Sequence, residues 1–126
     1  MFSKKQVLDE HDNLVNLFGG TLGINYEAKI DYAVEKFNQS VNKKDGSIEF
    51  YYEIIIGHPF TDGNKRTATH FLEHLLELNN YKLITTDDEL IELALTITRK
   101  NELSEKTIGS PISFEEVKYI ISKFIK

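Results

Sequence analysis

The sequence predicts an all-α protein, a single compact bundle of about six helices. Apolar residues recur at three- and four-residue spacing through most of the chain, and the alternation typical of half-buried strands is nearly absent. Three capping pairs mark helix starts: Ser3 with Gln6, Thr86 with Glu89, and Ser113 with Glu116. The chain has 126 residues, of which 40% are hydrophobic, so residues 1–126 can bury one core as a single domain.

Three helices are expected in the first half of the chain. The first carries apolar residues from Val7 to Phe18 and ends at two glycines, and the second runs from about Tyr26 to Phe37. The stretch Asn38–Gly46 breaks the helical period and ends in a turn signal, so we expect a loop or a short exposed hairpin there. Residues 47–57 are rich in isoleucine and resemble a strand, but their helical spacing and the final Gly57 favour a helix.

Three more helices are expected in the second half. Apolar residues mark one face of a helix over Ala68–Leu76, and Thr86–Ile97 is apolar on almost every side, which predicts a central helix. Residues 101–111 are polar and contain Gly109 and Pro111, so they are expected to form a connection before the last helix.

Composition limits the possible functions. The formal net charge of -5 argues against nonspecific nucleic-acid binding, which depends on an excess of Lys and Arg. The chain has no cysteine, so it offers neither a thiol nucleophile nor a thiolate metal site. Its first residues lack the apolar core of a signal peptide, and no apolar run could span a bilayer. We therefore expect a cytoplasmic protein that does not bind a membrane.

One segment, His58 to Thr67, combines a base, a carboxylate, a glycine and two cations ahead of an apolar helix. Histidine titrates near neutral pH, so His58 is a candidate general base. Asp62 could hold Mg²⁺ or cap the following helix, or do both. Backbone at Gly63 can approach a phosphate closely, and Asn64 can add a side-chain donor. The segment is typical of a site for a magnesium nucleotide.

Lys65 and Arg66 lie in the first turn of the expected helix, where positive charge opposes the helix dipole. A helix that serves only structure would favour acidic residues there, so these two cations indicate an anionic ligand. Phe60 is interpreted differently, as an apolar anchor that holds the loop to the core.

The segment His58-Pro-Phe-Thr-Asp-Gly-Asn-Lys-Arg-Thr67 resembles the active-site motif of the Fic/Doc superfamily, and specifically of its death-on-curing (Doc) branch. The general Fic signature is H-x-F-x-[DE]-G-N-G-R-x-x-R. This chain has Lys65 in place of a glycine and Thr69 in place of the second arginine, and Doc toxins share both departures. Weaker similarities extend outward to four short stretches, residues 8–12, 18–20, 78–81 and 86–89.

The resemblance implies a nucleotide-dependent transferase in which His58 activates a hydroxyl of a protein substrate. It implies that Asp62 holds Mg²⁺ and that residues 63–66 bind the phosphates of ATP. Fic proteins with both arginines transfer AMP, whereas Doc proteins with the lysine variant transfer the terminal phosphate, with elongation factor Tu as target. Thr69 therefore favours a kinase over an adenylyltransferase.

The resemblance also implies protein partners. Doc is the toxin of a toxin–antitoxin pair and is inhibited by a separately encoded antitoxin; no internal inhibitory motif of the form [ST]-x-x-x-E-[GN] occurs here. Family members carry an exposed flap that aligns the substrate by strand addition, and we expect it within Asn38–Gly46.

Two other interpretations remain. His70-Phe-Leu-Glu-His74 fits the H-x-x-E-H zinc signature, but no third ligand is apparent and proteases with this signature are far larger. His70 lies one turn beyond Arg66 and could border the nucleotide cleft, although a partly exposed surface position is favoured. The chain could also be a noncatalytic binding module, which the intact motif disfavours. His11, on the apolar face of the first helix, is expected to be a core histidine with its hydrogen bonds satisfied.

Overall fold

The computed structural model describes all residues from Met1 to Lys126. It contains six α-helices and no strand, only two isolated β-bridges, which confirms the all-α class. The helices are α1 (Lys4–Phe18), α2 (Glu27–Gln39), α3 (Lys43–Gly57), α4 (Asn64–Leu78), α5 (Asp87–Ile108) and α6 (Phe114–Ser122).

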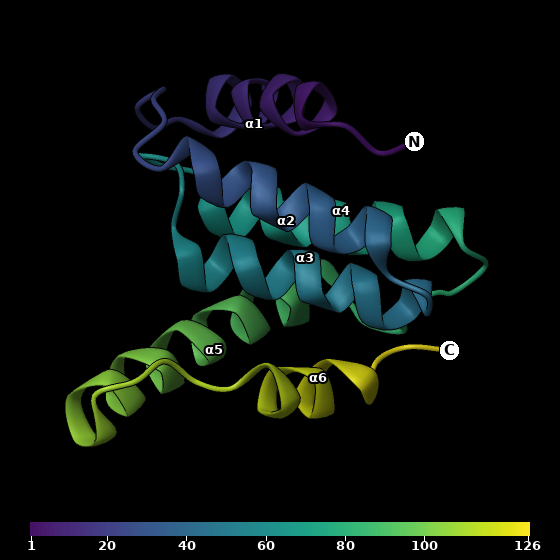
Figure 1. Cartoon of the computed structure of the whole chain (residues 1–126), viewed down its shortest axis with the longest axis vertical. Coiled ribbons are helices and arrows are strands. Elements are labelled where there is room, and N and C mark those ends of the chain that lie inside the picture. The colour runs from purple at the N-terminus through teal and green to yellow at the C-terminus, as the bar shows by residue number, and fades with distance from the viewer.

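Helix α3 lies at the centre of the bundle. It packs against α2, α4, α5 and α6, while α1 lies across the far side of α2 and α4 (Figure 1). Its isoleucine-rich sequence is explained by this place, because α3 buries residues on several sides: Gly46, Ser47, Ile48, Phe50, Tyr51, Ile54 and Ile55. The expectation of a central helix at Thr86–Ile97 was wrong, since α5 buries only Leu90, Ala94 and Ile97 and leaves Ile91 59% exposed.

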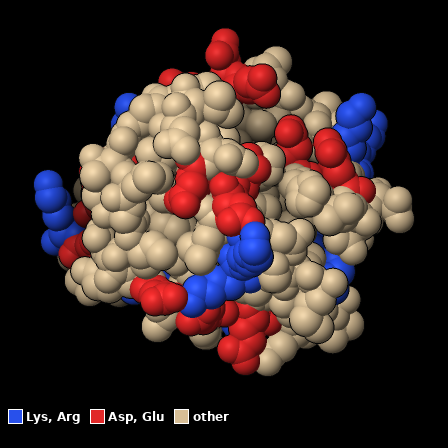
Figure 2. Space-filling view, turned by 90° about the horizontal axis from the view of Figure 1, so that it is seen from above, with Lys and Arg blue, Asp and Glu red and all other residues tan.

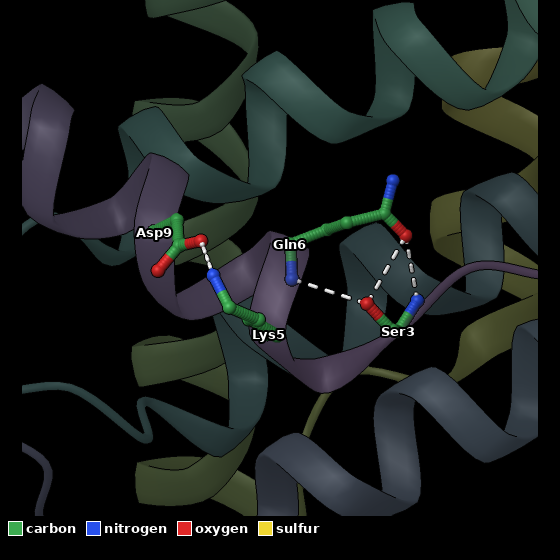
Figure 3. A network of polar contacts seen from close by, with 4 residues as sticks. All are labelled: Ser3, Lys5, Gln6 and Asp9. Atoms are coloured by element: carbon green, nitrogen blue, oxygen red, sulfur yellow. Dashed lines mark hydrogen bonds and ion pairs between the residues drawn. The ribbon is translucent and has the colours of Figure 1, made fainter.

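The start of α1 has the predicted capping box. The Ser3 hydroxyl accepts a hydrogen bond from the Gln6 N–H at 3.2 Å, and the Ser3 N–H donates to Gln6 Oε1 at 2.8 Å (Figure 3). These two bonds satisfy backbone donors that would otherwise lack partners at the helix end.

The predicted loop at Asn38–Gly46 is reduced to residues 40–42, and no hairpin forms there. Helix α2 continues to Gln39 and α3 already begins at Lys43, with the Asn42 side chain accepting from the Asp45 N–H at 3.1 Å. The Lys43 ammonium donates to the Phe37 carbonyl at 2.9 Å and so caps the end of α2. The glycine taken as a turn residue, Gly46, serves close helix packing, because a Cβ there would lie 2.1 Å from Ser40 Oγ.

Helix α5 is longer than the sequence pattern indicated. Residues 101–108, expected to be a connection, continue the helix to Ile108, and Gly109 ends it with a left-handed φ of 73°. This last part of α5 is mostly exposed and extends away from the other helices (Figure 1), so it needs no apolar stripe. The connection to α6 begins only at Gly109.

The segment just before α5 pairs with the end of the chain. Lys82 and Lys126 exchange backbone hydrogen bonds of 2.9 and 2.8 Å, and the Ile84 N–H donates to the Phe124 carbonyl at 2.6 Å. No helix is long and apolar enough to cross a membrane. On the face seen from above, acidic and basic side chains are interspersed, and Lys and Arg form no extended patch (Figure 2).

Candidate active site

The motif residues line a cavity of about 700 Å³ where α1, the loop before α4, and the starts of α4 and α5 meet. This volume falls within the range of small-molecule sites. The motif supplies its polar side: His58, Thr61, Asp62, Gly63, Asn64, Lys65 and Arg66. The opposite wall is largely apolar and comes from α1 and α5: Leu14, Phe18, Leu90, Ile91, Ala94 and Leu95.

His58 is placed at the cavity by an uncommon backbone conformation. Its N–H still closes the last turn of α3 on the Ile54 carbonyl at 3.1 Å, but its φ is 50°, in the left-handed region. That conformation costs about 1 kcal/mol or more for a residue other than glycine, so the surrounding contacts must hold it. It ends α3 and leaves the imidazole exposed at the cavity.

Asn64 fixes the loop that follows His58. Its Oδ1 accepts from the Phe60 N–H at 3.0 Å, and its Nδ2 donates to the Phe60 carbonyl at 2.9 Å. The other hydrogen of Nδ2 is directed at His58 Nδ1, 3.2 Å away. Asn64 is only 4% exposed, and its amide joins the base to the start of α4 from below the cavity surface.

This arrangement determines which ring nitrogen of His58 carries hydrogen. Since Nδ1 accepts from Asn64, the hydrogen of the neutral ring lies on Nε2. To accept a proton at Nε2 the ring must move its hydrogen to Nδ1, and the contact with Asn64 must open. Losing one such hydrogen bond costs about 1 kcal/mol, which is small for a catalytic step.

Asp62 makes two separate contacts through its backbone and its side chain. Its carbonyl lies 2.7 Å from His11 Nε2, and its Oδ2 accepts from the Thr21 N–H at 2.8 Å. The other carboxylate oxygen makes no hydrogen bond within the protein and lies in an exposed residue at the cavity. The side chain thus connects the loop to the segment between α1 and α2 and keeps one oxygen available.

The start of α4 presents uncompensated positive charge. Gly63 precedes the helix with a left-handed φ of 81° and provides no side-chain cap, so the first backbone N–H groups have no partner within the protein. Neither Lys65 nor Arg66 pairs with a carboxylate; the Arg66 guanidinium instead lies over the Phe18 ring, 4.5 Å from its centroid. These donors and cations make the site suited to an anion.

Phe60 lies beneath this loop. It is completely buried, and its ring is stacked on His11 with centroids 3.6 Å apart and planes at 10°. His11 itself is 1% exposed and has a partner at each ring nitrogen, Asp12 Oδ1 at 3.1 Å and the Asp62 carbonyl at 2.7 Å. The expected satisfied core histidine is therefore confirmed.

The structure adds residues that sequence reasoning did not assign to the site. His70 has a side chain that is 39% exposed, as expected of a partly exposed histidine, and it also lines the cavity, with Nδ1 3.9 Å from Glu10 Oε1. Its place one turn after Arg66 is the reason that a position beside the cleft was an alternative from the sequence. Asp87 and the apolar wall of α5 had no such signal, because only tertiary packing brings α5 to the motif.

No three His, Cys, Asp or Glu side chains come together in a way that could hold a metal ion among themselves. His70 and His74 stack at 6.0 Å without a third ligand, which gives no support to a zinc site. Mg²⁺ has different needs, because it is commonly held by one or two carboxylates together with substrate phosphates and water. The free oxygen of Asp62, beside an anion site, fits that role.

Comparison with known proteins agrees with this geometry. The model of the Fic/DOC family matches residues 1–76, more than half of the chain, from α1 through most of α4 and including the whole motif. Among curated proteins, none matches the chain. Members of the matched family are enzymes that modify proteins by transferring a nucleotide or phosphate group. The extent of the match shows that this chain belongs to the Fic/DOC family.

Proposed function

We propose that this protein transfers the γ-phosphate of ATP to a hydroxyl group of a protein, as a Doc-like kinase. The observation that carries the proposal is one cavity holding a base, His58, a free carboxylate oxygen on Asp62, and the uncompensated cations of α4. Phosphoryl transfer depends mainly on positioning and on neutralising phosphate charge, and this inventory supplies both.

In the proposed reaction, the triphosphate lies against the start of α4, where Gly63, Asn64, Lys65 and Arg66 bind its phosphates. His58 removes the proton from the substrate hydroxyl as that oxygen attacks the γ-phosphorus, and the bond to the β,γ-bridging oxygen breaks. ADP leaves, and the phosphate ester remains on the substrate. Mg²⁺ bound at Asp62 would neutralise charge on the phosphates.

Thr69 supports transfer of the terminal phosphate over transfer of AMP. It lines the cavity at the position where the general Fic signature has its second arginine. The cavity therefore has Lys65 and Arg66 as its cations and lacks the second arginine that accompanies AMP transfer in the general signature.

A segment beside the motif is suited to align the substrate. Ile24 forms an antiparallel bridge with Phe60, and backbone bonds join Gly23 to Thr61 and Asn25 to Pro59. The N–H and C=O groups of Leu22 and Ile24 have no partner within the protein. We propose that this segment, and not Asn38–Gly46, is the flap, because an extended substrate can pair with its free edge next to His58.

The resemblance to Doc extends the proposal to partners. The proposed target is elongation factor Tu, and phosphorylation would block translation in the cytoplasm. A separately encoded antitoxin would inhibit the enzyme.

The test compares ATP labelled at the α or the γ position, with Mg²⁺ and a bacterial translation extract. We expect the wild type to label a protein only from γ-labelled ATP. The variant His58→Ala is expected to reduce that labelling by at least about 100-fold, because it removes the general base. Its far-ultraviolet circular dichroism should match that of the wild type, which separates lost chemistry from lost folding.

Two results would contradict the proposal. Labelling from the α position would assign AMP transfer, despite Lys65 and Thr69. Nucleotide binding without labelling from either position, tested also with purified elongation factor Tu, would make the chain a binding module.

A further inference from the structure

We infer that His11, on α1, is a positioning residue that directs the Gly63 N–H into the cavity. The role of that N–H as a phosphate donor rests on the function proposed above. The contact that directs it, between His11 and the Asp62 carbonyl, is present without any ligand.

His11 contacts the motif loop from the core side. It is 1% exposed and does not line the cavity, whereas Asp62 and Gly63 do. Its Nε2 lies 2.7 Å from the Asp62 carbonyl oxygen, and since a carbonyl can only accept, Nε2 is the donor. The ring cannot move away easily, because it is stacked on Phe60 and buried.

Because the peptide bond is planar, the contact at the Asp62 carbonyl also sets the direction of the Gly63 N–H. The protein has no cis peptide, and in a planar trans peptide the C=O and the next N–H point in opposite directions. A carbonyl of Asp62 turned toward His11 therefore turns the Gly63 N–H away from the core, to the side where Gly63 lines the cavity. That N–H has no acceptor within the protein, so it remains free for a ligand.

A glycine at this position makes such a constraint necessary. Gly63 has a φ of 81°, and a Cβ would lie 3.0 Å from Val15 Cγ2 and 3.4 Å from the His11 ring. No other residue fits this turn without strain, yet glycine also permits the preceding peptide to rotate to the opposite orientation. The hydrogen bond from His11 to the Asp62 carbonyl selects one orientation.

Two substitutions separate the hydrogen bond from the stacking. His11→Phe keeps an aromatic ring against Phe60 but has no donor for the Asp62 carbonyl. His11→Gln loses the ring but places an amide donor near the position of Nε2. If phenylalanine fails to pack, His11→Leu removes the donor with a smaller side chain. Thermal unfolding of each variant establishes that the measurements are made on folded protein.

The first measurement is the ¹H–¹⁵N spectrum of the ligand-free protein, because the amide shift of Gly63 responds to the hydrogen bond on the preceding carbonyl. The second is a titration with inorganic pyrophosphate. We expect His11→Phe to shift the Gly63 resonance and to weaken pyrophosphate binding about tenfold, the effect of one charge-assisted hydrogen bond. His11→Gln restores a donor and should bind pyrophosphate within about threefold of the wild type.

An unchanged Gly63 resonance in His11→Phe would overturn the inference. A loss of pyrophosphate binding in His11→Gln as large as that in His11→Phe would also overturn it, because that result would assign the effect to stacking. A shifted resonance in His11→Phe, combined with a wild type that does not bind pyrophosphate, would uphold the control of the N–H direction. That last result would count against the proposed function instead.

Discussion

Among single residues, Asn64 shows that a motif residue can hold the loop in place as well as line the cavity. Its three hydrogen bonds to Phe60 and His58 use both amide hydrogens and the carbonyl oxygen. An aspartate of the same shape would have no hydrogen to donate to the Phe60 carbonyl or to His58 Nδ1 when ionised. The amide is thus needed to form the loop before any ligand arrives.

Tyr51 presents the opposite case, a buried polar group without a partner. It is 1% exposed, its hydroxyl makes no hydrogen bond, and burial raises the pKa of this phenol above its ordinary value of 10.0. We predict that Tyr51→Phe leaves the free energy of unfolding at pH 7 unchanged or raises it by about 1 kcal/mol, because an unsatisfied hydroxyl is removed. Urea unfolding measures this difference.

The same substitution should change the response to alkaline pH. Above about pH 10 the unfolded chain ionises this tyrosine while the folded protein retains the proton, so unfolding releases a proton and stability falls as pH rises. The phenylalanine variant lacks this contribution, and its advantage should grow between pH 9 and about pH 11. Tyr119→Phe, at a site 67% exposed, is the control. An advantage independent of pH would contradict the account.

Among the helices, α1 has a capping box at its first turn and also supplies part of the cavity wall. Its capping box joins Ser3 to Gln6, and one turn further an exposed ion pair joins Lys5 to Asp9 (Figure 3). We predict that Ser3→Ala lowers the free energy of unfolding by about 1 kcal/mol, since it removes a cap, and that Lys5→Ala has a smaller effect. If thermal or urea unfolding showed equal losses of stability in the two variants, the capping box would not contribute more than the exposed ion pair.

Loop and helix boundaries depend on more than local signals. The Asn42–Gly46 stretch contains residues typical of turns, yet it forms the cap and first turn of α3, because Gly46 lets that turn approach Ser40 closely. The role of a glycine there is visible only when both helices are in place.

For the whole molecule, the cavity joins parts that lie far apart in the sequence. The family match ends at residue 76, whereas one wall of the cavity is formed by residues 90–95 of α5. If the nucleotide occupies this cavity, its binding must stabilise both parts together. The structure therefore makes α5 part of the proposed nucleotide site.

Hydrogen exchange can test this arrangement. We predict that Mg²⁺ with ATP slows amide exchange in residues 62–66 and also in residues 90–95, with no comparable change in residues 30–37 of α2, which lie outside the cavity. Using His58→Ala prevents turnover during the measurement. Protection limited to the motif would place the nucleotide away from α5.

The sequence by itself determined the helical class, the caps at Ser3 and Thr86, and the motif from His58 to Thr67. These features depend on interactions between residues a few positions apart, so they can be read from spacing. Only the tertiary structure decided that α3 is central, that α5 forms a wall of the cavity, and that His11 holds a peptide 51 positions away. Those outcomes depend on which surfaces pack together, and apolar periodicity shows that a face is buried without showing against what.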